Sequence, residues 1–406
     1  MQMAELTALL TPEGLRLLEQ LPPIDSTTDV ARAVSTLRAA GHSPDLVSAV
    51  VGQARLRTRA QAKFGDHANR MLFTRTGLEQ ATRLALTTRH AARFLQAGMQ
   101  HVADLGCGIG ADSLGLAGLG LTVTAIDSDE VTAAIAAYNL AVFGDSVTVR
   151  HHRAEDFSDE VDAAWLDPAR RIHSQQEHSR DAHSPPDSGR SRTEEWSPPL
   201  PWVLSFAQRV ACGIKLGPGL DRELIPNDAE AQWISVDGST VELVLWTGVL
   251  ARPEVRRAAL VTRGEASWEL VAREDAPDEP VQKLGEYLHE PAGSVIRARL
   301  IGEVARALEA GMLADKIAYL TSDTALTSPF VSTFRIRERL PVDRKPLAAA
   351  LRARNIGTLE IKKRGVDVDP AQLRTALKLR GDESATLILT RIAGKRVALL
   401  AERIPA

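Results

Sequence analysis

Apolar residues recur at two different spacings along this chain, and the spacing changes near residue 98. Over residues 1–98 they recur every three or four positions, which predicts helices that pack through one apolar face. The segment Thr11-Pro12-Glu13 marks one helix start, because Thr is a good N-cap and Pro is favoured at the first helical position. We therefore expect an N-terminal helical domain over residues 1–98.

After Gly98, short apolar runs of four to seven residues alternate with helical stretches. This alternation is typical of βαβ units, and it predicts an α/β domain with a mostly parallel sheet over residues 99–250. The predicted strands are seven, at residues 101–105, 121–126, 147–151, 161–166, 211–216, 231–236 and 241–247.

Residues 173–201 interrupt this domain. They are rich in Ser, Pro, His, Arg and Glu and contain almost no aliphatic residues, so they cannot bury a core, and we expect a flexible loop. A disordered insertion without function explains the same composition equally well.

Two further domains are expected after residue 250. Residues 251–318 predict a small α/β domain, and residues 319–406 predict an α+β domain. The elements of the latter are a strand at 332–337, a helix at 345–354, a strand at 357–363, a helix at 370–379 and two closing strands separated by Gly394.

The composition limits the class of protein. The chain has 406 residues, of which 44% are hydrophobic, as in a globular protein of several domains. Its two cysteines, Cys107 and Cys212, are too few for a disulfide framework or a four-ligand zinc site, and they fit a reducing compartment. No signal peptide is visible, nor an apolar stretch of the roughly 20 residues that a membrane helix needs. We expect a cytoplasmic protein without a membrane partner or a bound metal.

The formal net charge of −3 conceals two opposite regions. Residues 331–406 contain 17 Lys and Arg against 8 Asp and Glu, a net charge of +9, whereas residues 1–330 carry −12. Such an excess of basic residues can contact the phosphates of a nucleic acid without reading its sequence. A merely solvated charged face is the alternative, and Phe334 is the only aromatic residue available there to stack on a base. The basic residues that alternate along one expected strand face are Arg335, Arg337 and Arg339.

The strongest chemical signal is the run Asp104-Leu105-Gly106-Cys107-Gly108-Ile109-Gly110, between a predicted strand and a predicted helix. Three alternating glycines permit a tight turn that a ligand can approach closely, and the helix N-terminus offers free N–H groups. Asp104 discriminates between ligands, because a carboxylate here would repel the pyrophosphate of a dinucleotide and would favour a cationic sulfonium with an ammonium group. A purely structural turn is the alternative.

A second carboxylate ends the next predicted strand. Asp127 lies 17 residues after Gly110, where it can accept hydrogen bonds from both hydroxyls of an adenosine ribose. Capping of the following helix is the alternative role for this side chain.

These two motifs resemble those of the class I S-adenosylmethionine-dependent methyltransferases, over roughly residues 70–250. The resemblance implies S-adenosylmethionine as the cofactor and a Rossmann-like seven-stranded sheet with an antiparallel last strand. In the third motif, Arg153 stands where many members have an acid, so the implied adenine contact is Glu155 or Asp156, for which helix capping is an alternative. The other implied contacts are Gly106, Gly108 and Gly110 at the methionine end, Asp104 near its amino group, and Asp127 on the ribose.

A fourth motif, Asp167-Pro168-Ala169-Arg170, follows the strand at 161–166, at the edge where ligands of such sheets bind. It is similar to the Asp/Asn-Pro-Pro-aromatic motif of methyltransferases that act on exocyclic amines of bases. The resemblance implies that Asp167, with the adjacent backbone carbonyl at Pro168, accepts hydrogen bonds from the amine. Arg170 replaces the aromatic residue, and an Arg plane can also stack on a base or bind a phosphate. A turn that only terminates the strand is the alternative.

The C-terminal region resembles the THUMP-like domain of a group of bacterial methyltransferases, in segments such as 319–321, 328–330 and 358–365. The THUMP fold binds RNA in several tRNA-modifying enzymes, so the resemblance implies an RNA partner. The expected fold class is α/β: the Rossmann-like methyltransferase sheet, an N-terminal helical region, and C-terminal α+β domains that are ferredoxin-like and THUMP-like.

We therefore expect a methyltransferase that modifies a base of structured RNA, tRNA or rRNA, with Asp167 orienting or deprotonating the acceptor. Neither cysteine lies in a substrate-facing motif, so covalent attack on a pyrimidine is not expected. Residues 73–82 are a candidate lid over the cofactor, or an ordinary linker helix. The alternatives are a protein or small-molecule acceptor, a non-catalytic RNA-binding protein with a residual cofactor pocket, and a nicotinamide dehydrogenase. The sequence leaves the oligomeric state open.

Overall fold

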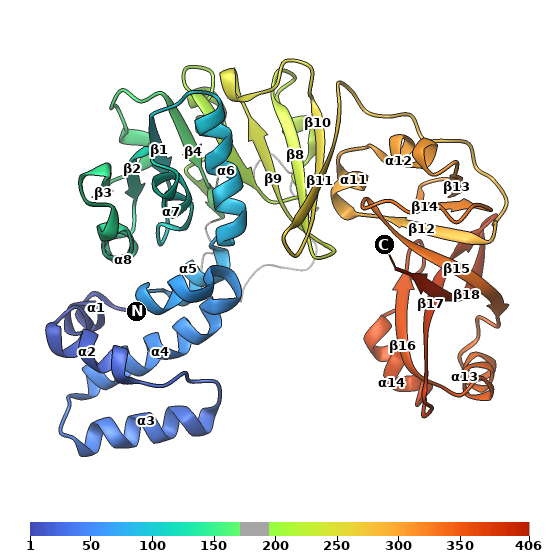
Figure 1. Cartoon of the computed structure of the whole chain (residues 1–406), viewed down its shortest axis with the longest axis horizontal. Helices are drawn as coiled ribbons and strands as arrows, with labels where there is room; N and C mark the ends of the chain where they lie inside the picture. Colours follow the sequence, from blue (N-terminus) through green and yellow to red (C-terminus); the bar gives the residue numbers. More distant parts are fainter. Residues whose placement is uncertain (171–194, 406) are drawn as a thin grey trace, which may run out of the picture. The chain divides into compact units, whose positions relative to one another are not determined.

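The computed structural model of the protein describes residues 1–170 and 195–405 (Figure 1). Most of the loop predicted at 173–201 lies outside these residues. Its described end is not a loop, because it contains strand β6 (Trp196–Ser197) and the start of helix α10 (Leu200–Phe206). The side chains of Trp196 and Leu200 are buried, so this end has apolar anchors that the overall composition of the segment conceals.

Two compact units make up the chain. The first consists of Met1–Leu216 and Leu245–Ala251, and the second of Gly217–Val244 and Arg252–Ala406. The division into four domains that the sequence suggests stays a prediction.

Helices form the N-terminal part of the first unit, as predicted. Helix α2 begins at the expected cap, where the Thr11 hydroxyl accepts a hydrogen bond from the N–H of Gly14 at 3.0 Å. Within the described residues, no helix is long and apolar enough to cross a membrane. The helices are α1 (Met3–Leu9), α2 (Pro12–Gln20), α3 (Thr27–Ala39), α4 (Pro44–Phe64), α5 (Arg75–Gln80) and α6 (Leu84–Gln96).

Two side-chain amides connect these helices to the first sheet and its turns. Gln53 on α4 exchanges two hydrogen bonds with the backbone of Phe73, at 2.7 and 3.0 Å. Asn139, on α8 (Glu130–Leu140), exchanges two with the backbone of Leu72, also at 2.7 and 3.0 Å. The same Asn139 amide donates to the carbonyl of Ile109 in the glycine-rich turn at 2.9 Å. The backbone N–H and C=O groups of the buried residues Leu72 and Phe73 therefore form their hydrogen bonds with side chains and not with a neighbouring strand.

The first sheet has the strand order β11-β10-β8-β9-β7-β4-β1-β2-β3. The neighbours β1–β2, β1–β4, β2–β3, β4–β7 and β8–β10 are parallel, as predicted. Strands β8 and β9 are joined by the two-residue turn Asp237-Gly238, with positive φ at both positions, which is the geometry of an antiparallel hairpin. The strands are β1 (His101–Leu105), β2 (Thr122–Asp127), β3 (Val147–His151), β4 (Ala163–Leu166), β7 (Ala211–Leu216), β8 (Glu230–Val236), β9 (Ser239–Trp246), β10 (Arg257–Arg263) and β11 (Ala266–Ala272).

The seven predicted strands are all present in this sheet. Among the described residues the sheet has nine strands, because β10 and β11 extend it beyond β8. The remaining strands of residues 251–318 join the second sheet, so these residues do not build a sheet of their own. Pairing of strands is long-range, and a local apolar pattern does not show which sheet a strand joins. The remaining elements are β12 (Tyr287–Pro291), α11 (Gly293–Arg297), α12 (Ile301–Ala307), β13 (Gly311–Ala314) and β14 (Ile317–Ser322).

The second sheet has the strand order β13-β14-β12-β15-β18-β17-β16. Its C-terminal part follows the predicted order of strand, helix, strand, helix and two strands. One core joins Leu347 and Leu351 of the first of these helices with Leu387 and Leu400 of the strands. The elements are β15 (Val331–Leu340), α13 (Arg344–Ala353), β16 (Ile356–Lys363), α14 (Pro370–Leu377), β17 (Glu383–Ile392) and β18 (Lys395–Ile404).

An aromatic cluster fixes α6 on the first sheet. The ring of His90 stacks on Trp165 of β4 at a centroid distance of 4.5 Å, and Phe94 lies 5.8 Å from Trp246 of β9. Gly213 of β7 lies between the two tryptophans, and a Cβ on it would come within 2.7 Å of both rings. Only glycine leaves room for both indoles in this buried layer.

We predict that Gly213→Ala lowers the free energy of unfolding by about 1–3 kcal/mol, because the added methyl overpacks a rigid aromatic layer. Gly52→Ala on α4 is the matched control, since a Cβ there meets nothing within 4 Å and alanine favours the helix. Urea unfolding of the variants measures both effects. Equal stability of Gly213→Ala and the wild type would contradict the packing described.

Candidate active site

The glycine-rich turn connects β1 to helix α7 (Ala111–Gly118). Gly106, Gly108 and Gly110 have φ values of +99°, +56° and +84°, a left-handed region that other residues rarely adopt. A Cβ on Gly106 would lie 3.3 Å from the backbone oxygen of Asp167, so the end of β4 lies directly beside the turn. A Cβ on Gly108 would meet no described atom within 4 Å, so the backbone of the turn is open there.

Asp104 lies near the end of β1 and is only 1% exposed. Its Oδ2 accepts a hydrogen bond from the Ser113 hydroxyl at 2.6 Å, whereas its Oδ1 is buried without a partner in the described part of the chain. Burial, reinforced by the nearby carboxylate of Asp112, raises the pKa of Asp104 to about 8. A buried carboxylate oxygen without a partner is unfavourable, and an ammonium group would satisfy it. The site therefore fits the cationic amino-acid end of S-adenosylmethionine.

Asp127 ends β2, the strand next to β1. Its Oδ2 accepts a hydrogen bond from the N–H of Gly108, and its Oδ1 accepts one from the N–H of Asp129, both at 2.9 Å. Each oxygen keeps capacity for a further hydrogen bond, such as one from a ribose hydroxyl. Burial raises the pKa of Asp127. The structure thus brings together the two carboxylates and the glycine turn that the sequence singled out.

Glu155 and Asp156 lie in a 3-10 turn after β3, spanning Ala154–Asp156. Glu155 pairs with Arg153 at 3.0 Å, whereas Asp156 is exposed. This turn begins beside Asp127, because the N–H of His152 donates to the Asp127 carbonyl at 3.0 Å. Neither acid makes a described hydrogen bond to the glycine turn.

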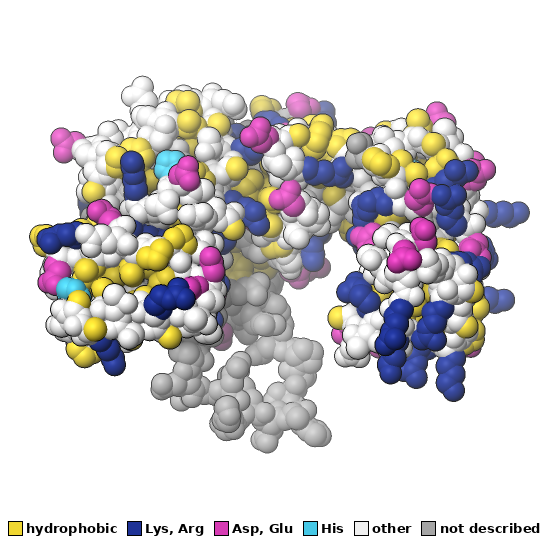
Figure 2. Space-filling model, turned by 60° about the horizontal axis from the view of Figure 1, so that its bottom comes forward, with side chains coloured by type: hydrophobic (Ala, Val, Ile, Leu, Met, Phe, Trp, Pro, Cys, Tyr) yellow, Lys and Arg dark blue, Asp and Glu magenta, His cyan; other side chains and the backbone are white. Residues whose placement is uncertain are grey.

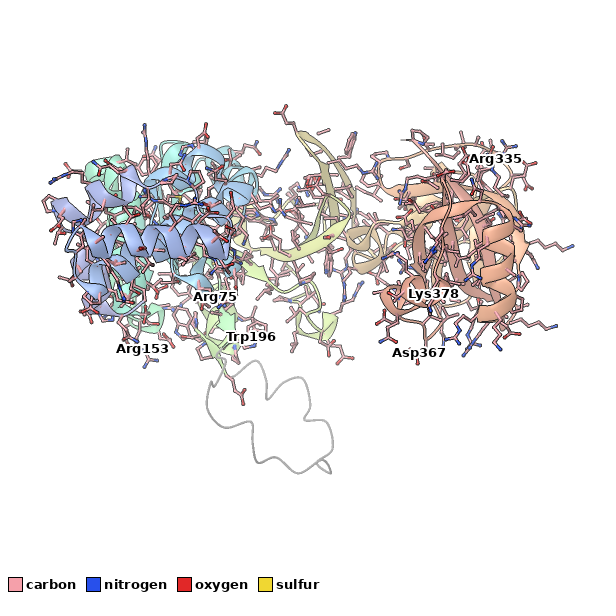
Figure 3. The ribbon with its side chains drawn as sticks, turned by 90° about the horizontal axis from the view of Figure 1, so that it is seen from below. Arg75, Arg153, Trp196, Arg335, Asp367 and Lys378 are labelled. Carbon is pink, nitrogen blue, oxygen red and sulfur yellow. The ribbon has the colours of Figure 1, made fainter. Side chains whose placement is uncertain are left out.

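Asp167 follows β4 and forms an ion pair with Lys215 of β7. Pro168 is buried. The backbone of Arg170 pairs with Trp196 in the short strands β5 (Ala169–Arg170) and β6, and its side chain lies outside the described part of the structure. Figure 3 shows Arg153, Arg75 of α5 and Trp196 along the same side of the first unit.

Sequence reasoning missed the cation at the centre of this site. The Lys215 side chain is 12% exposed, and its Nζ donates to the Thr82 hydroxyl at 2.9 Å and lies 3.9 Å from a carboxylate oxygen of Asp112. Asp112 also accepts from Thr82 at 2.9 Å and lies 3.5 Å from His90 Nδ1. Burial alone would raise the pKa of Asp112, but Lys215, His90 and Thr82 together hold it below its ordinary value. Lys215 is the only charged residue of β7, and a lysine within an otherwise uncharged strand is the sequence feature that could have indicated a functional role.

Helix α5, within the predicted lid segment at 73–82, packs on the glycine-rich turn. A Cβ on Gly77 would come within 2.5 Å of the Ile109 side chain, so helix and turn are in close contact. Lys63 Nζ donates to the carbonyls of Leu78, Glu79 and Ala81 at 2.7 to 2.8 Å and so holds the C-terminal end of α5.

The two cysteines are buried and free of disulfide bonds. Burial raises the pKa of the Cys212 thiol to about 12 and that of the Cys107 thiol well above its ordinary value. Neither forms a thiolate near neutral pH, which agrees with the expectation that neither is a nucleophile.

The fold is that of a Rossmann-like α/β enzyme core followed by a second, α+β sheet. Two proteins of Mycobacterium tuberculosis, from strains H37Rv and CDC 1551, are each described as an uncharacterized S-adenosylmethionine-dependent methyltransferase. Each is 31% identical to this chain over 352 residues, which cover 83% of this chain and 90% of the relative. The chain therefore belongs to the S-adenosylmethionine-dependent methyltransferases, and the predicted enzyme class and cofactor are confirmed.

Further comparisons concern single domains and the fold. Residues 331–403 match the family model of the THUMP domain-like proteins, which confirms the predicted THUMP-like domain. Residues 2–60 match a domain of unknown function, DUF8688. A solved structure from Porphyromonas gingivalis W83, described provisionally as a methyltransferase, is 20% identical and has a TM-score of 0.67. It covers 95% of this chain and 100% of its own, and it shares the fold.

We predict that the affinity for S-adenosylmethionine rises about tenfold between pH 6 and pH 7. The bound ammonium group favours ionised Asp104, whose pKa of about 8 keeps it protonated in the free protein over this range. The amino group of the cofactor stays protonated there, so it does not oppose the trend. Calorimetric titration at each pH measures the affinity.

Asp104→Asn is the control for this titration, because it removes the titrating group and keeps the shape. The variant should bind weakly and with little change between pH 6 and pH 7. A wild-type affinity that does not depend on pH would contradict the proposed contact.

Proposed function

We propose that this methyltransferase acts on structured RNA, a tRNA or an rRNA, and that it methylates a base. The observation that carries the proposal is the basic surface of the THUMP-like domain. Exposed Lys and Arg side chains gather over the C-terminal part of the second unit (Figure 2). Those on and directly after α13 and α14 are Arg344, Lys345, Arg352, Arg374, Lys378 and Arg380.

Several basic residues of the second sheet are neutralised by acids. Arg337 pairs with Glu402, and Arg403 pairs with Glu360 at 2.8 Å. Arg354 similarly pairs with Glu338, at 2.5 Å. Exposed basic residues therefore lie on the helices and also on the strands, where Arg335 and Arg339 of β15 are exposed. Figure 3 labels Arg335 and Lys378. A surface of this kind would position an RNA through its phosphates.

Aromatic stacking on bases contributes little to this surface. Phe334 is fully buried, with the guanidinium of Arg403 4.8 Å from its ring centroid. The domain would hold RNA by charge, and selection of the modified base would fall to the methyltransferase site.

The cofactor would be held by the residues of the first two motifs. Asp104 would accept hydrogen bonds from the amino group of S-adenosylmethionine, and the turn of Gly106, Gly108 and Gly110 would contact its methionine part. Asp127 would accept hydrogen bonds from both ribose hydroxyls. Glu155 or Asp156, beside the end of β2, would contact the adenine.

The acceptor would bind at the end of β4. When bound, S-adenosylmethionine supplies an activated methyl group on its sulfonium, so the protein needs mainly to align the acceptor and exclude water. Asp167 would orient an acceptor N–H or remove its proton, and Pro168 would fix the adjacent carbonyl. Arg170 would contact the base or a phosphate.

Lys215 would act as a positioning residue for Asp167. An ion pair with a largely buried lysine fixes the carboxylate of Asp167 in one place. The same lysine lies 3.9 Å from Asp112, so it approaches two carboxylates of the site.

The test of the function uses the purified full chain, methyl-labelled S-adenosylmethionine and total RNA from a strain that lacks the gene. Nucleoside mass spectrometry should find one labelled, methylated base. Asp167→Ala should reduce the rate about 10²-fold, because the group that orients the acceptor is lost. Asp145→Ala, an exposed aspartate outside the site, is the matched control.

Two results would overturn the proposal. Label that enters protein or a small molecule, with none in RNA, would assign a different acceptor. Cofactor binding without transfer to any fraction would favour a residual pocket in an RNA-binding protein.

We further predict that Lys215→Met lowers the rate of methyl transfer about 10²-fold, because it removes the cation that pairs with Asp167 and lies near Asp112. The acidic limb of the pH–rate profile should move to higher pH, since Lys215 lowers the pKa of Asp112 and its loss lets Asp112 bind a proton more readily. Lys215→Arg should restore part of the rate and the position of the limb. A pH–rate profile of Lys215→Met that matches the wild type would contradict the positioning role.

A further inference from the structure

A cavity of about 450 Å³ in the second unit is lined by four arginines, and no acidic side chain lines it. Arg222 lies in the segment after β7, and Arg297 is the last residue of α11. Arg299 lies two residues after α11, and Arg364 directly follows β16. We propose that this cavity binds a phosphate group of the RNA backbone. This inference rests on the proposed function. Three of the four arginines lie outside the domain at 331–403 that matches the family model, so the RNA contact would extend beyond that domain.

The carboxylate of Asp275 pairs with three arginines, of which Arg222 and Arg299 line this cavity. Asp275 binds Arg222 through both oxygens, at 2.6 and 2.8 Å, and Arg257 at 2.9 Å. Arg299 lies 3.9 Å from the same carboxylate. Three cations around one anion leave an excess of two positive charges, which repel one another in the absence of a further anion.

Arg297 adds a cation with no ion pair among the described residues. It ends α11 and is exposed, and its guanidinium nitrogens lie 3.9 and 4.0 Å from where a Cβ of Gly219 would be. The absence of a side chain at Gly219 leaves space beside this guanidinium. Its N–H donors are therefore available to a ligand in the cavity.

Arg364 also has unused hydrogen-bonding capacity. Its Nη2 lies 3.6 Å from Glu290, and its Nε is buried without a hydrogen-bond partner in the described residues. Its guanidinium carbon lies 5.3 Å from the centroid of the Tyr319 ring. The arginine is thus held in place by its neighbours while its hydrogen-bond donors are only partly used.

The chemistry of the lining selects a phosphate and not a base. Guanidinium groups match the oxygens of a phosphate in pairs of hydrogen bonds. Trp233 lines the cavity but is only 1% exposed, with Arg222 5.8 Å from its ring centroid, so it offers no free face for stacking. A contact of this kind is independent of RNA sequence.

The test measures RNA affinity as a function of salt for the full chain carrying Arg297→Glu and Arg299→Glu. Neither change removes a strong internal contact, because Arg297 has no ion pair in the described structure and Arg299 has only the long one to Asp275. The matched control reverses two exposed arginines of α2 and α3, Arg16→Glu and Arg38→Glu. Circular dichroism and thermal unfolding verify that each variant is folded, and unchanged affinity for S-adenosylmethionine verifies the first unit separately.

We expect the pocket variant to bind RNA about tenfold more weakly than the wild type at 0.1 M salt, with a log–log salt slope smaller by about one, because one phosphate contact is lost. The control variant should keep the slope of the wild type. A pocket variant that behaves like the control would overturn the inference while leaving the proposed function intact. Wild-type protein that shows no salt-dependent RNA binding would instead contradict the proposed function itself.

A second arm separates RNA from a free phosphate ligand. Wild type and pocket variant are titrated with inorganic phosphate in a calorimeter. Loss of phosphate binding in the variant together with weaker RNA binding supports the inference. Loss of phosphate binding with unchanged RNA affinity would show that the cavity serves a small phosphate ligand, and would overturn it.

Discussion

Burial of the Asp104 carboxylate is the constraint on which the candidate site in the first unit depends. Asp104, Asp112 and Asp167 lie near the ends of neighbouring elements, and Lys215 is the cation that approaches two of them. Among the described residues, the Ser113 hydroxyl is the only hydrogen-bond partner of the Asp104 side chain, and burial raises the pKa of Asp104 to about 8. A buried carboxyl group without a cation lowers the stability of the free protein, and the binding of a cation stabilises its ionised form. The cofactor of this family carries such a charge.

The surrounding fold keeps the Asp104 carboxylate buried. Three glycines with positive φ let β1 turn sharply into α7 without placing side chains between backbone and ligand. Helix α5 packs on the same turn, and Asn139 holds the Ile109 carbonyl behind it. The aromatic layer around Gly213 fixes β4 and β7, the two strands that present Asp167 and Lys215. Local packing thus sets the geometry of the charges.

The sequence predicts those features that depend on neighbours along the chain. The positions of Asp104 and Asp127 in the site are predictable because they lie at the ends of strands and next to a glycine-rich turn. The helices and strands of residues 331–404 are predictable from the spacing of their apolar residues. Lys215 was missed because its partners, Thr82, Asp112 and Asp167, are distant in sequence and meet only through sheet order. The extra strands β10 and β11 were missed for the same reason, since pairing with β8 is long-range. The arginine cavity likewise assembles from separate segments, each unremarkable alone.

The two units differ in electrostatic character: the first has a buried acidic site, and the second has a basic surface that we propose binds RNA. The central claim is the contact between Asp104 and the cofactor, and a crystal structure with S-adenosylhomocysteine tests it most directly. We expect the amino group of the ligand at about 3 Å from Asp104 Oδ1, with the ribose hydroxyls on Asp127. A ligand whose amino group binds elsewhere, while Asp104 Oδ1 stays without a partner, would contradict it.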